Sequence, residues 1–212
     1  MPAPLRRVLL GRRPYGFVHQ MQLDLVARRQ RDEIPDTVLI VEHEHVITLG
    51  RRQEAMKNVL AAGDIPVLEI ERGGDVTYHG PGQLVGYPIL KLAGDERDLH
   101  AYLRNIEQAL LDTLAHFGIT GTRNPGWTGA WVGDKKIASI GIAVRKWVTF
   151  HGFALNVRTD LKRFAAINPC GLKADVMTSM AEVLQRDVDL EEVAPVVCRA
   201  LADVFGRALV KA

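Results

Sequence analysis

The amino-acid sequence predicts a single α+β domain spanning residues 1–212, built on a mixed β-sheet flanked by helices. Stretches with apolar residues at helical spacing alternate irregularly with stretches of β-branched residues, and several of the latter follow one another as hairpins. Hairpins favour a mixed sheet over a strictly parallel one wound by crossover helices. Because the chain has no linker rich in Ser, Gly or Pro and no internal repeat, we expect one domain.

The first half of the chain is expected to hold one helix and several short strands. Residues 8–10 have the composition of a strand that runs into a turn at Gly11. A helix is predicted from Tyr15 to about Arg31, since apolar residues recur there at helical spacing: Phe17, Met21 and Leu25, with Val18 and Val26 beside them. β-Branched or apolar runs predict strands at 37–41, 46–49 and 67–70.

The second half begins with the clearest helix, from Leu99 to Phe117, which Gly118 should end. Residues 128–157 change to the period of strands, with turns at 133–134 and 145–146. A helical stripe returns over residues 190–209 and predicts a last helix.

Composition excludes several classes of protein. Hydrophobic residues make up 47% and charged residues 25%, which is ordinary for a globular protein. A net charge of +2 is too small to indicate nucleic acid, and no apolar stretch approaches the ~20 residues of a membrane span. The arginine-rich start has the look of a transit peptide, but it lacks serine and residues 8–10 suit a strand. We therefore expect a cytoplasmic protein with no nucleic-acid or membrane partner.

A glycine-rich segment from Arg72 to Gln83, RGGDVTYHGPGQ, is the first candidate for a binding site. Its four glycines indicate unusual backbone conformations or a close approach of backbone to ligand. Arginine, histidine and glutamine beside them favour a binding loop over an ordinary turn. The phosphate-binding pattern G-x-x-x-x-G-K-[ST] is missing, so nucleotide binding is not indicated.

The chain has two cysteines, which excludes a disulfide framework and a cysteine-based zinc site. Cys170 lies between Pro169 and Gly171, which place it in a turn that can face a cleft. Cys198 lies on the stripe of the last helix, where a free cysteine is usually buried packing. Cys170 is therefore the better candidate for a nucleophile, with an inert turn cysteine as the open alternative.

A lysine at the start of a predicted strand is the third candidate. In the segment 133–141, GDKKIASIG, alternation puts Lys136, Ala138 and Ile140 on one face. Lys135 is close to the turn and is expected to be solvated, whereas the ammonium of Lys136 can be carried inward. Next to a thiol, such a cation lowers the thiol pKa and stabilises the thiolate.

These segments, in this order, resemble the lipoyl(octanoyl) transferase family. The segment 72–83, extended to Tyr87, matches that family's signature, and KIASIG (136–141), HGFALN (151–156) and PCG (169–171) match its remaining blocks. The similarity runs from about Val8 to the last helix. It implies a catalytic domain with the fold of biotin and lipoate protein ligases.

The resemblance also implies an acyl transfer in two steps. Cys170 would attack the octanoyl thioester on acyl carrier protein, and a target lysine would then take the octanoyl group as an amide. The implied acceptors are the lipoyl domains of 2-oxoacid dehydrogenase complexes and the glycine-cleavage H protein. Lys136 would lower the pKa of Cys170 and serve as general acid and base. No cofactor and no ATP are implied, since amide formation from a thioester is downhill, and we expect a monomer.

By the same resemblance, glycines and small residues leave room for a narrow apolar channel for the eight-carbon chain, whose burial contributes roughly 0.8 kcal/mol per CH₂. The residues implied to bind substrate are Arg72, Gly73, Gly74, Asp75, Val76, Thr77, Tyr78, His79, Ser139, Ile140, Gly141, Gly152, Phe153 and Ala154. Backbone N–H groups near Gly171 or in the glycine-rich segment can hold the oxyanion.

A pair of histidines and a set of basic doublets are two further features of the sequence. The segment 42–45, EHEH, stands where the family usually has Glu-His followed by prolines. Its histidines, His43 and His45, are spaced like a metal pair on one strand face, but no third ligand is evident, so we expect them to be structural or at the surface, with no metal site. Basic doublets are candidates for a patch that binds the acidic carrier protein, the alternative being solvated faces, above all at 28–29. The doublets are 12–13, 28–29, 51–52, 135–136 and 145–146.

Three other functions remain as alternatives. An ATP-dependent lipoate or biotin protein ligase shares the expected fold, but the glycine-rich segment lacks the longer motifs of those families and Cys170 would have no role. A non-catalytic module that binds lipoyl domains or acyl chains would not need Cys170 and Lys136. A thiol hydrolase would use the same acyl-enzyme with water as the acceptor.

Overall fold

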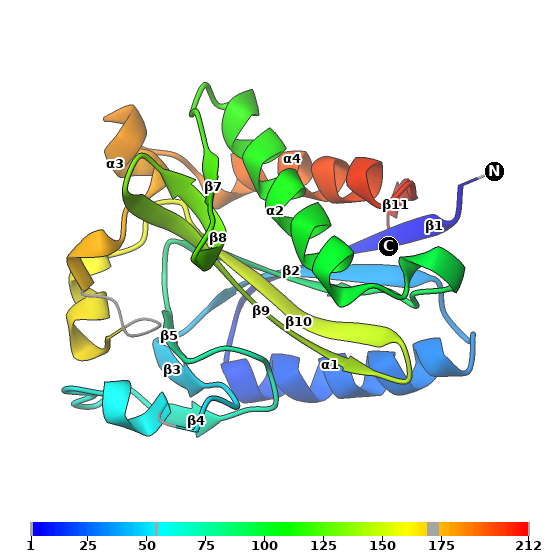
Figure 1. Cartoon of the computed structure of the whole chain (residues 1–212), viewed down its shortest axis with the longest axis horizontal. Helices are drawn as coiled ribbons and strands as arrows, with labels where there is room; N and C mark the ends of the chain where they lie inside the picture. The colour runs from blue at the N-terminus through cyan, green and yellow to red at the C-terminus, as the bar shows by residue number, and fades with distance from the viewer. Residues whose placement is uncertain (1, 54, 169–173, 212) are drawn as a thin grey trace.

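The computed structural model describes residues 2–53, 55–168 and 174–211, and it contains two β-sheets (Figure 1). The large sheet consists, in spatial order, of β11 (Ala208–Lys211), β1 (Pro4–Arg13), β2 (Asp36–His43), β6 (Gln83–Ile89), β10 (Val148–Asn156), β9 (Lys135–Arg145), β8 (Trp127–Val132) and β7 (Thr122–Asn124). The small sheet consists of β4 (Val67–Glu69), β3 (Val46–Leu49) and β5 (Val76–His79). The helices are α1 (Tyr15–Gln30), α2 (Leu99–His116), α3 (Met180–Leu184) and α4 (Leu190–Val204), with short 3₁₀ turns η1 (Ala55–Asn58), η2 (Gly94–Glu96), η3 (Leu161–Ala166) and η5 (Ala174–Val176).

The large sheet is mixed, which confirms the predicted fold class. β11, β1 and β2 are parallel neighbours, whereas β2, β6, β10, β9, β8 and β7 pair in an antiparallel manner. Because β1 pairs with β11, both ends of the described chain lie at one edge of the molecule (Figure 1).

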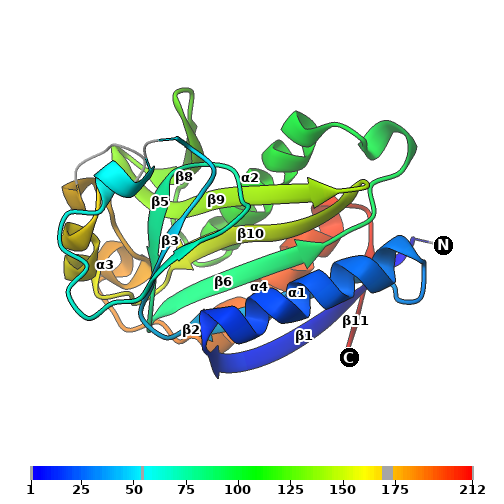
Figure 2. The ribbon, with the colours of Figure 1, turned by 90° about the horizontal axis from the view of Figure 1, so that it is seen from below.

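Helices cover both faces of the large sheet. Figure 1 shows α2 and α4 on one face and α1 on the other, and Figure 2 shows α1 running along the strands. Strand β2 explains this arrangement, since its side chains alternate between the two faces. Val38 and Ile40 belong to the core under α2 and α4, whereas Leu39 and Val41 pack towards α1. A strand buried on both faces needs the continuous apolar run that the sequence shows.

Helix α1 begins at Tyr15 as predicted, but its buried face differs from the predicted one. Val18, Gln22 and Leu25 are buried, whereas Phe17 is exposed. The side-chain oxygen Oε1 of Gln22 accepts a hydrogen bond from the backbone N–H of His151 at 2.8 Å. Because a polar side chain occupies the packed face, apolar spacing alone placed the stripe incorrectly.

Near both ends of the chain, the predicted boundary of one element is wrong. Helix α4 ends at Val204, not at Leu209, because Gly206 adopts a left-handed φ of +59° and Leu209 then pairs with Leu5 as part of β11. Strand β1 does not end at Gly11. It continues to Arg13 through a register shift, at which Gly11 has a φ of +63°.

The central elements follow the predictions closely. Helix α2 begins at Leu99 behind Asp98, whose carboxylate accepts from the backbone N–H groups of His100 and Ala101 at 2.8 and 3.1 Å. The hairpin between β9 and β10 turns at Lys146 and Trp147, one residue later than predicted. None of the helices in the described ranges is long and apolar enough to cross a membrane.

The glycine-rich segment is only partly a loop. Residues 72–75 are irregular, but Val76–His79 form β5, which pairs with β3, and β6 starts at Gln83. The segment therefore links the small sheet to the centre of the large one, and this connection positions the candidate site.

Candidate active site

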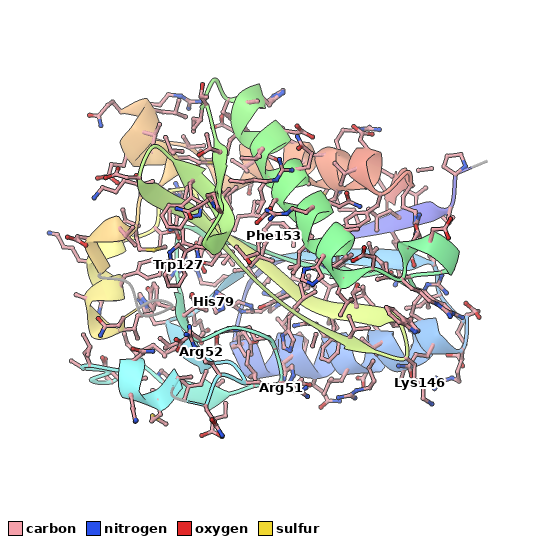
Figure 3. The ribbon with its side chains drawn as sticks, viewed as in Figure 1. Arg51, Arg52, His79, Trp127, Lys146 and Phe153 are labelled. Carbon is pink, nitrogen blue, oxygen red and sulfur yellow. The ribbon has the colours of Figure 1, made fainter. Side chains whose placement is uncertain are left out.

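A cavity of about 470 Å³ is bounded by the glycine-rich segment, by β9 and β10, and by Tyr15 at the start of α1. Figure 3 shows His79 of β5, Trp127 of β8 and Phe153 of β10 in this part of the molecule. Among the described residues, every sequence-predicted site residue except Tyr78 lines it. These are Arg72, Gly73, Gly74, Asp75, Val76, Thr77, His79, Lys136, Ser139, Ile140, Gly141, Gly152, Phe153 and Ala154.

Buried polar side chains hold the irregular part of the glycine-rich segment. Arg72 is 7% exposed, and its Nη2 donates to the backbone O and the Oγ1 of Thr48 at 2.8 and 3.1 Å, while Nη1 donates to the carbonyl of Gly73 at 3.1 Å. The buried carboxylate of Asp75 accepts from Asn58 Nδ2 at 2.9 Å and from the next backbone N–H at 2.7 Å. These contacts fix the loop before any ligand binds, which reduces the entropy lost on binding.

Gly141 of β9 lets this loop approach the sheet. A Cβ at position 141 would lie 2.9 Å from Cδ of Arg72 and 3.0 Å from the carbonyl oxygen of Gly73. The backbone N–H of Gly73 donates to the carbonyl of Ile142 at 2.8 Å. A side chain at 141 would therefore force the loop off the sheet and change the wall of the cavity.

His79 is held in one tautomer. The Nε2 of Gln83 donates to the carbonyl of Tyr78 at 3.2 Å and to Oδ1 of Asn156 at 3.0 Å, which orients the amide of Gln83. Its Oε1 therefore faces Nδ1 of His79 at 2.7 Å and accepts the proton carried there. Burial lowers the pKa of His79 to about 3, and the charges of His43 and Arg72 add to the effect. At neutral pH His79 is an uncharged imidazole whose Nε2 is a hydrogen-bond acceptor.

Lys136 is buried, at 3% exposure, and lines the cavity. Its Nζ lies 5.6 Å from the centre of the Trp131 ring, within the range of a cation–π contact. A register shift between β8 and β9 pairs Trp131 with Lys136 and Ala130 with Ala138, leaving Ile137 as the extra residue of a bulge. Ala138 consequently packs into the core beside Ile137. Ile140 packs against the same core as Ala138, whereas Lys136 lies on the other side of the bulge, opposite Trp131. The predicted common face of Lys136, Ala138 and Ile140 is therefore confirmed for Ala138 and Ile140 and wrong for Lys136.

Cys170, with Pro169 and Gly171, lies outside the described residues. The chain on either side of that gap is described and is fixed to the site. The backbone N–H of Asn168 donates to the carbonyl of Asn58 at 2.8 Å, and that of Thr178 donates to the carbonyl of Lys136 at 3.0 Å. Cys198 is fully buried on α4, and burial raises its pKa to about 12. Cys198 is therefore inert packing at neutral pH.

Tyr78 and two histidines do not line the cavity. The Tyr78 ring packs edge-on against Phe164 at 5.3 Å, and its hydroxyl contacts Nδ1 of His45 at 2.7 Å. His43 is fully buried; its Nδ1–H donates to the carbonyl of Arg13 at 3.0 Å, so its Nε2 accepts from the Tyr87 hydroxyl at 2.8 Å. His43 and His45 thus have separate hydrogen-bond partners.

Several residues that line the cavity were not assigned from the sequence. They are Tyr15, Arg52, Val85, Tyr87, Leu103, Gly126, Trp127, Thr128, Ile142 and His151. Tyr87 and His151 belong to the matched motifs, so the family resemblance could have predicted them as site residues. Tyr15 and Trp127 are the first residues of α1 and of β8, where no local pattern distinguishes them.

The basic doublets do not form one patch. Figure 3 shows Arg51 and Arg52 near the small sheet and Lys146 at the far end of the β9–β10 hairpin. Arg29, expected to be solvated, is only 17% exposed in its side chain and donates to Asp36 at 2.8 Å. Of the doublets, only 51–52 and 135–136 border the cavity through one member each, Arg52 and Lys136.

Comparison with known proteins identifies the family. Residues 14–202 match the model of the lipoyl protein ligase A/B catalytic domain. The octanoyltransferase of Gloeobacter violaceus is 50% identical over 195 residues, covering 91% of this chain and 86% of the relative. The octanoyltransferase of Solibacter usitatus is 50% identical over 202 residues, covering 92% and 90%.

Solved structures support the fold at lower identity. The bipartite lipoate protein ligase of Thermoplasma acidophilum is 18% identical with a TM-score of 0.75, over 100% of this chain and 87% of that one. The biotin protein ligase of Aquifex aeolicus is 15% identical with a TM-score of 0.54, over 97% and 70%. The predicted likeness to lipoate and biotin ligases is therefore confirmed for the fold. By its sequence, the chain belongs to the lipoyl protein ligase A/B catalytic domain family and, among its members, to the octanoyltransferases, and it is an acyltransferase enzyme.

Proposed function

We propose that the protein transfers an octanoyl group from the thioester of acyl carrier protein to a lysine of a lipoyl domain, through a thioester on Cys170. The observation that carries this proposal is the buried Lys136, which lines the cavity while its carbonyl binds Thr178, in the chain that follows Cys170. A lysine ammonium in a buried cavity is stabilised by an anion, and a cysteine thiolate is the anion that this chemistry needs.

In the first step the thiolate of Cys170 attacks the carbonyl carbon of the carrier's thioester. The pantetheine sulfur leaves and takes a proton from the ammonium of Lys136. The product is an octanoyl thioester on Cys170, and Lys136 is left as a neutral amine.

In the second step the acceptor lysine, as a neutral amine, attacks the same carbonyl carbon. Its nitrogen loses one proton to Lys136, and Cys170 leaves as a thiolate, so the charges on both residues return to their starting state. The amide is more stable than the thioester, so the transfer needs no ATP.

The cavity suits the acyl group. Its volume of about 470 Å³ lies in the range of small-molecule sites. Val76, Ile140, Phe153 and Ala154 supply apolar walls. Burial of the six methylenes of an octanoyl group contributes roughly 5 kcal/mol at about 0.8 kcal/mol each.

The experiment supplies octanoyl-acyl carrier protein and an apo lipoyl domain, with no ATP, and follows the mass of the lipoyl domain. We expect the domain to gain one octanoyl group, and a domain with its target lysine changed to alanine to gain none. A transfer that requires ATP and free octanoate would instead identify a ligase, and release of octanoate with no gain by the domain would identify a hydrolase.

A further inference from the structure

A cluster of two histidines and one carboxylate lies at the border of the cavity, which His151 lines, and it has no role in the proposed acyl-transfer steps. His19 comes from α1, Glu71 precedes the glycine-rich segment, and His151 comes from β10. Nε2 of His19 lies 3.0 Å from Oε2 of Glu71, and Nε2 of His151 lies 3.7 Å from the same oxygen. One ligand atom from each residue lies within 4.8 Å of the others, the one such group found among the described ranges.

His151 is the residue that most needs a ligand, because its imidazole is buried and has no hydrogen-bond partner among the described residues. The residue is 1% exposed, and neither ring nitrogen reaches a hydrogen-bond partner among the described residues. A buried polar group without a partner costs about 1–3 kcal/mol. The two unpartnered ring nitrogens leave His151 a lone pair that a metal ion can accept.

The two carboxylate oxygens of Glu71 have different neighbours, and one of them is placed to bind a metal ion together with the histidines. Its Oε1 faces Nη2 of Arg145 at 3.7 Å, whereas Oε2 faces the two imidazoles. The Arg145 side chain is 55% exposed and can turn away from an incoming cation.

We propose that His19, Glu71 and His151 bind a divalent transition-metal ion of the Zn²⁺ type, which the sequence did not predict. Two imidazole nitrogens and one carboxylate oxygen form a ligand set that Zn²⁺ accepts, with a fourth position left for water. The side chains of His19 and Glu71 are 24% and 21% exposed, so the ion has access from solvent. Coordination at about 2.0–2.2 Å brings ligand atoms to roughly 3.5 Å from one another, a shift that the partly exposed His19 can make.

The test is a Zn²⁺ titration of the untagged full chain by calorimetry. We expect one equivalent to bind at micromolar or tighter affinity, and His19→Gln to weaken binding at least about tenfold. Because the His19 side chain is partly exposed, this variant should fold, which circular dichroism checks. His116→Gln, an exposed histidine at the end of α2, is the matched control and should bind as the parent does.

Two further variants separate this site from other sources of zinc binding. Cys170→Ala should retain the ion, since the thiol is not among the proposed ligands. Arg145→Gln should bind more tightly, because the competing cation near Glu71 is removed. The proposal is overturned if no Zn²⁺ binds at ~100 μM, if His19→Gln binds as the parent does, or if Cys170→Ala abolishes binding. None of these outcomes depends on acyl transfer, so they leave the proposed function untouched.

Discussion

The backbone N–H of Thr178 donates a 3.0 Å hydrogen bond to the carbonyl oxygen of Lys136. The carbonyl of Thr178 in turn accepts from Nδ2 of Asn156 at 3.0 Å, and Oδ1 of Asn156 accepts from Gln83, the residue that orients His79. These bonds join β5, β6, β9 and β10 to the chain that follows Cys170. The backbone around Lys136 is thereby fixed relative to the cavity.

Replacing Lys136 by alanine should slow acylation of the enzyme by roughly 10²- to 10⁴-fold near neutral pH, since the proposed mechanism then loses both the cation that stabilises the thiolate and the proton donor. The rate should recover in part as pH rises, because more of the thiol ionises unaided. Acylation rates from quenched time courses between about pH 6 and about pH 9 measure this dependence on pH. Lys135→Ala, the exposed neighbour, is the control. A parental rate for Lys136→Ala at neutral pH removes Lys136 from the mechanism.

Reversing the charge of Arg51 should slow acylation by acyl carrier protein more than acylation by octanoyl-pantetheine, because only the protein donor presents an acidic surface. Arg51 is exposed near the small sheet, whereas Lys146 lies at the far end of the β9–β10 hairpin (Figure 3). Lys146→Glu therefore serves as the matched control with the same change of charge. Equal slowing with both donors in Arg51→Glu argues against docking at this surface.

Gly141→Ala should impair binding of the acyl group, because the new methyl group meets Arg72 and Gly73 at about 3 Å. Overpacking of this kind typically costs about 1–3 kcal/mol of stability. Gly16→Ala, in α1 with open space around it, should instead stabilise the protein by up to about 1 kcal/mol. Thermal unfolding and the KM for the octanoyl donor measure the two effects. An unchanged KM in Gly141→Ala shows that the loop does not shape the acyl site.

Stability should fall as pH is lowered from about 6.5 towards 4, because burial lowers the pKa of His43 to about 4 and that of His79 to about 3. In this range the histidines of the unfolded chain bind protons that the folded imidazoles do not. The contribution of the buried histidines to the free energy of unfolding is therefore complete above pH 6.5 and decreases below it. At about 1.4 kcal/mol per pKa unit, His43 alone accounts for about 3 kcal/mol. Urea unfolding at about pH 7.5 and about pH 5 measures the loss, and His43→Gln should reduce it. A midpoint that does not change with pH contradicts this account of the buried histidines.

Local patterns predicted the central elements and missed features that depend on distant partners. Helix α2 and strands β8 to β10 carry their own caps, turns and periodicity, so their positions follow from neighbouring residues. Leu209 continues the apolar spacing of α4, yet it becomes part of β11 because β1 offers an open edge. Phe17 fits a helical stripe, yet Gln22 takes the packed face because it binds the backbone of His151.

The candidate site also has a part that local sequence patterns predicted and a part that they missed. The glycine-rich segment, β9 and β10 each hold a recognisable motif, and the fold brings those motifs to one cavity. His19, Glu71 and His151 are far apart in the sequence and have no spacing that signals a shared ligand. Only the packing of α1 against β10 brings the two histidines to the same carboxylate.

The most direct test of the central claim is the intact mass of the protein after incubation with octanoyl-acyl carrier protein alone, followed by mapping of the modified peptide. We predict one octanoyl group on Cys170, absent in Cys170→Ala, retained in Cys198→Ala, and removed when an apo lipoyl domain is added. A protein that modifies the lipoyl domain while Cys170→Ala does so equally well would contradict it.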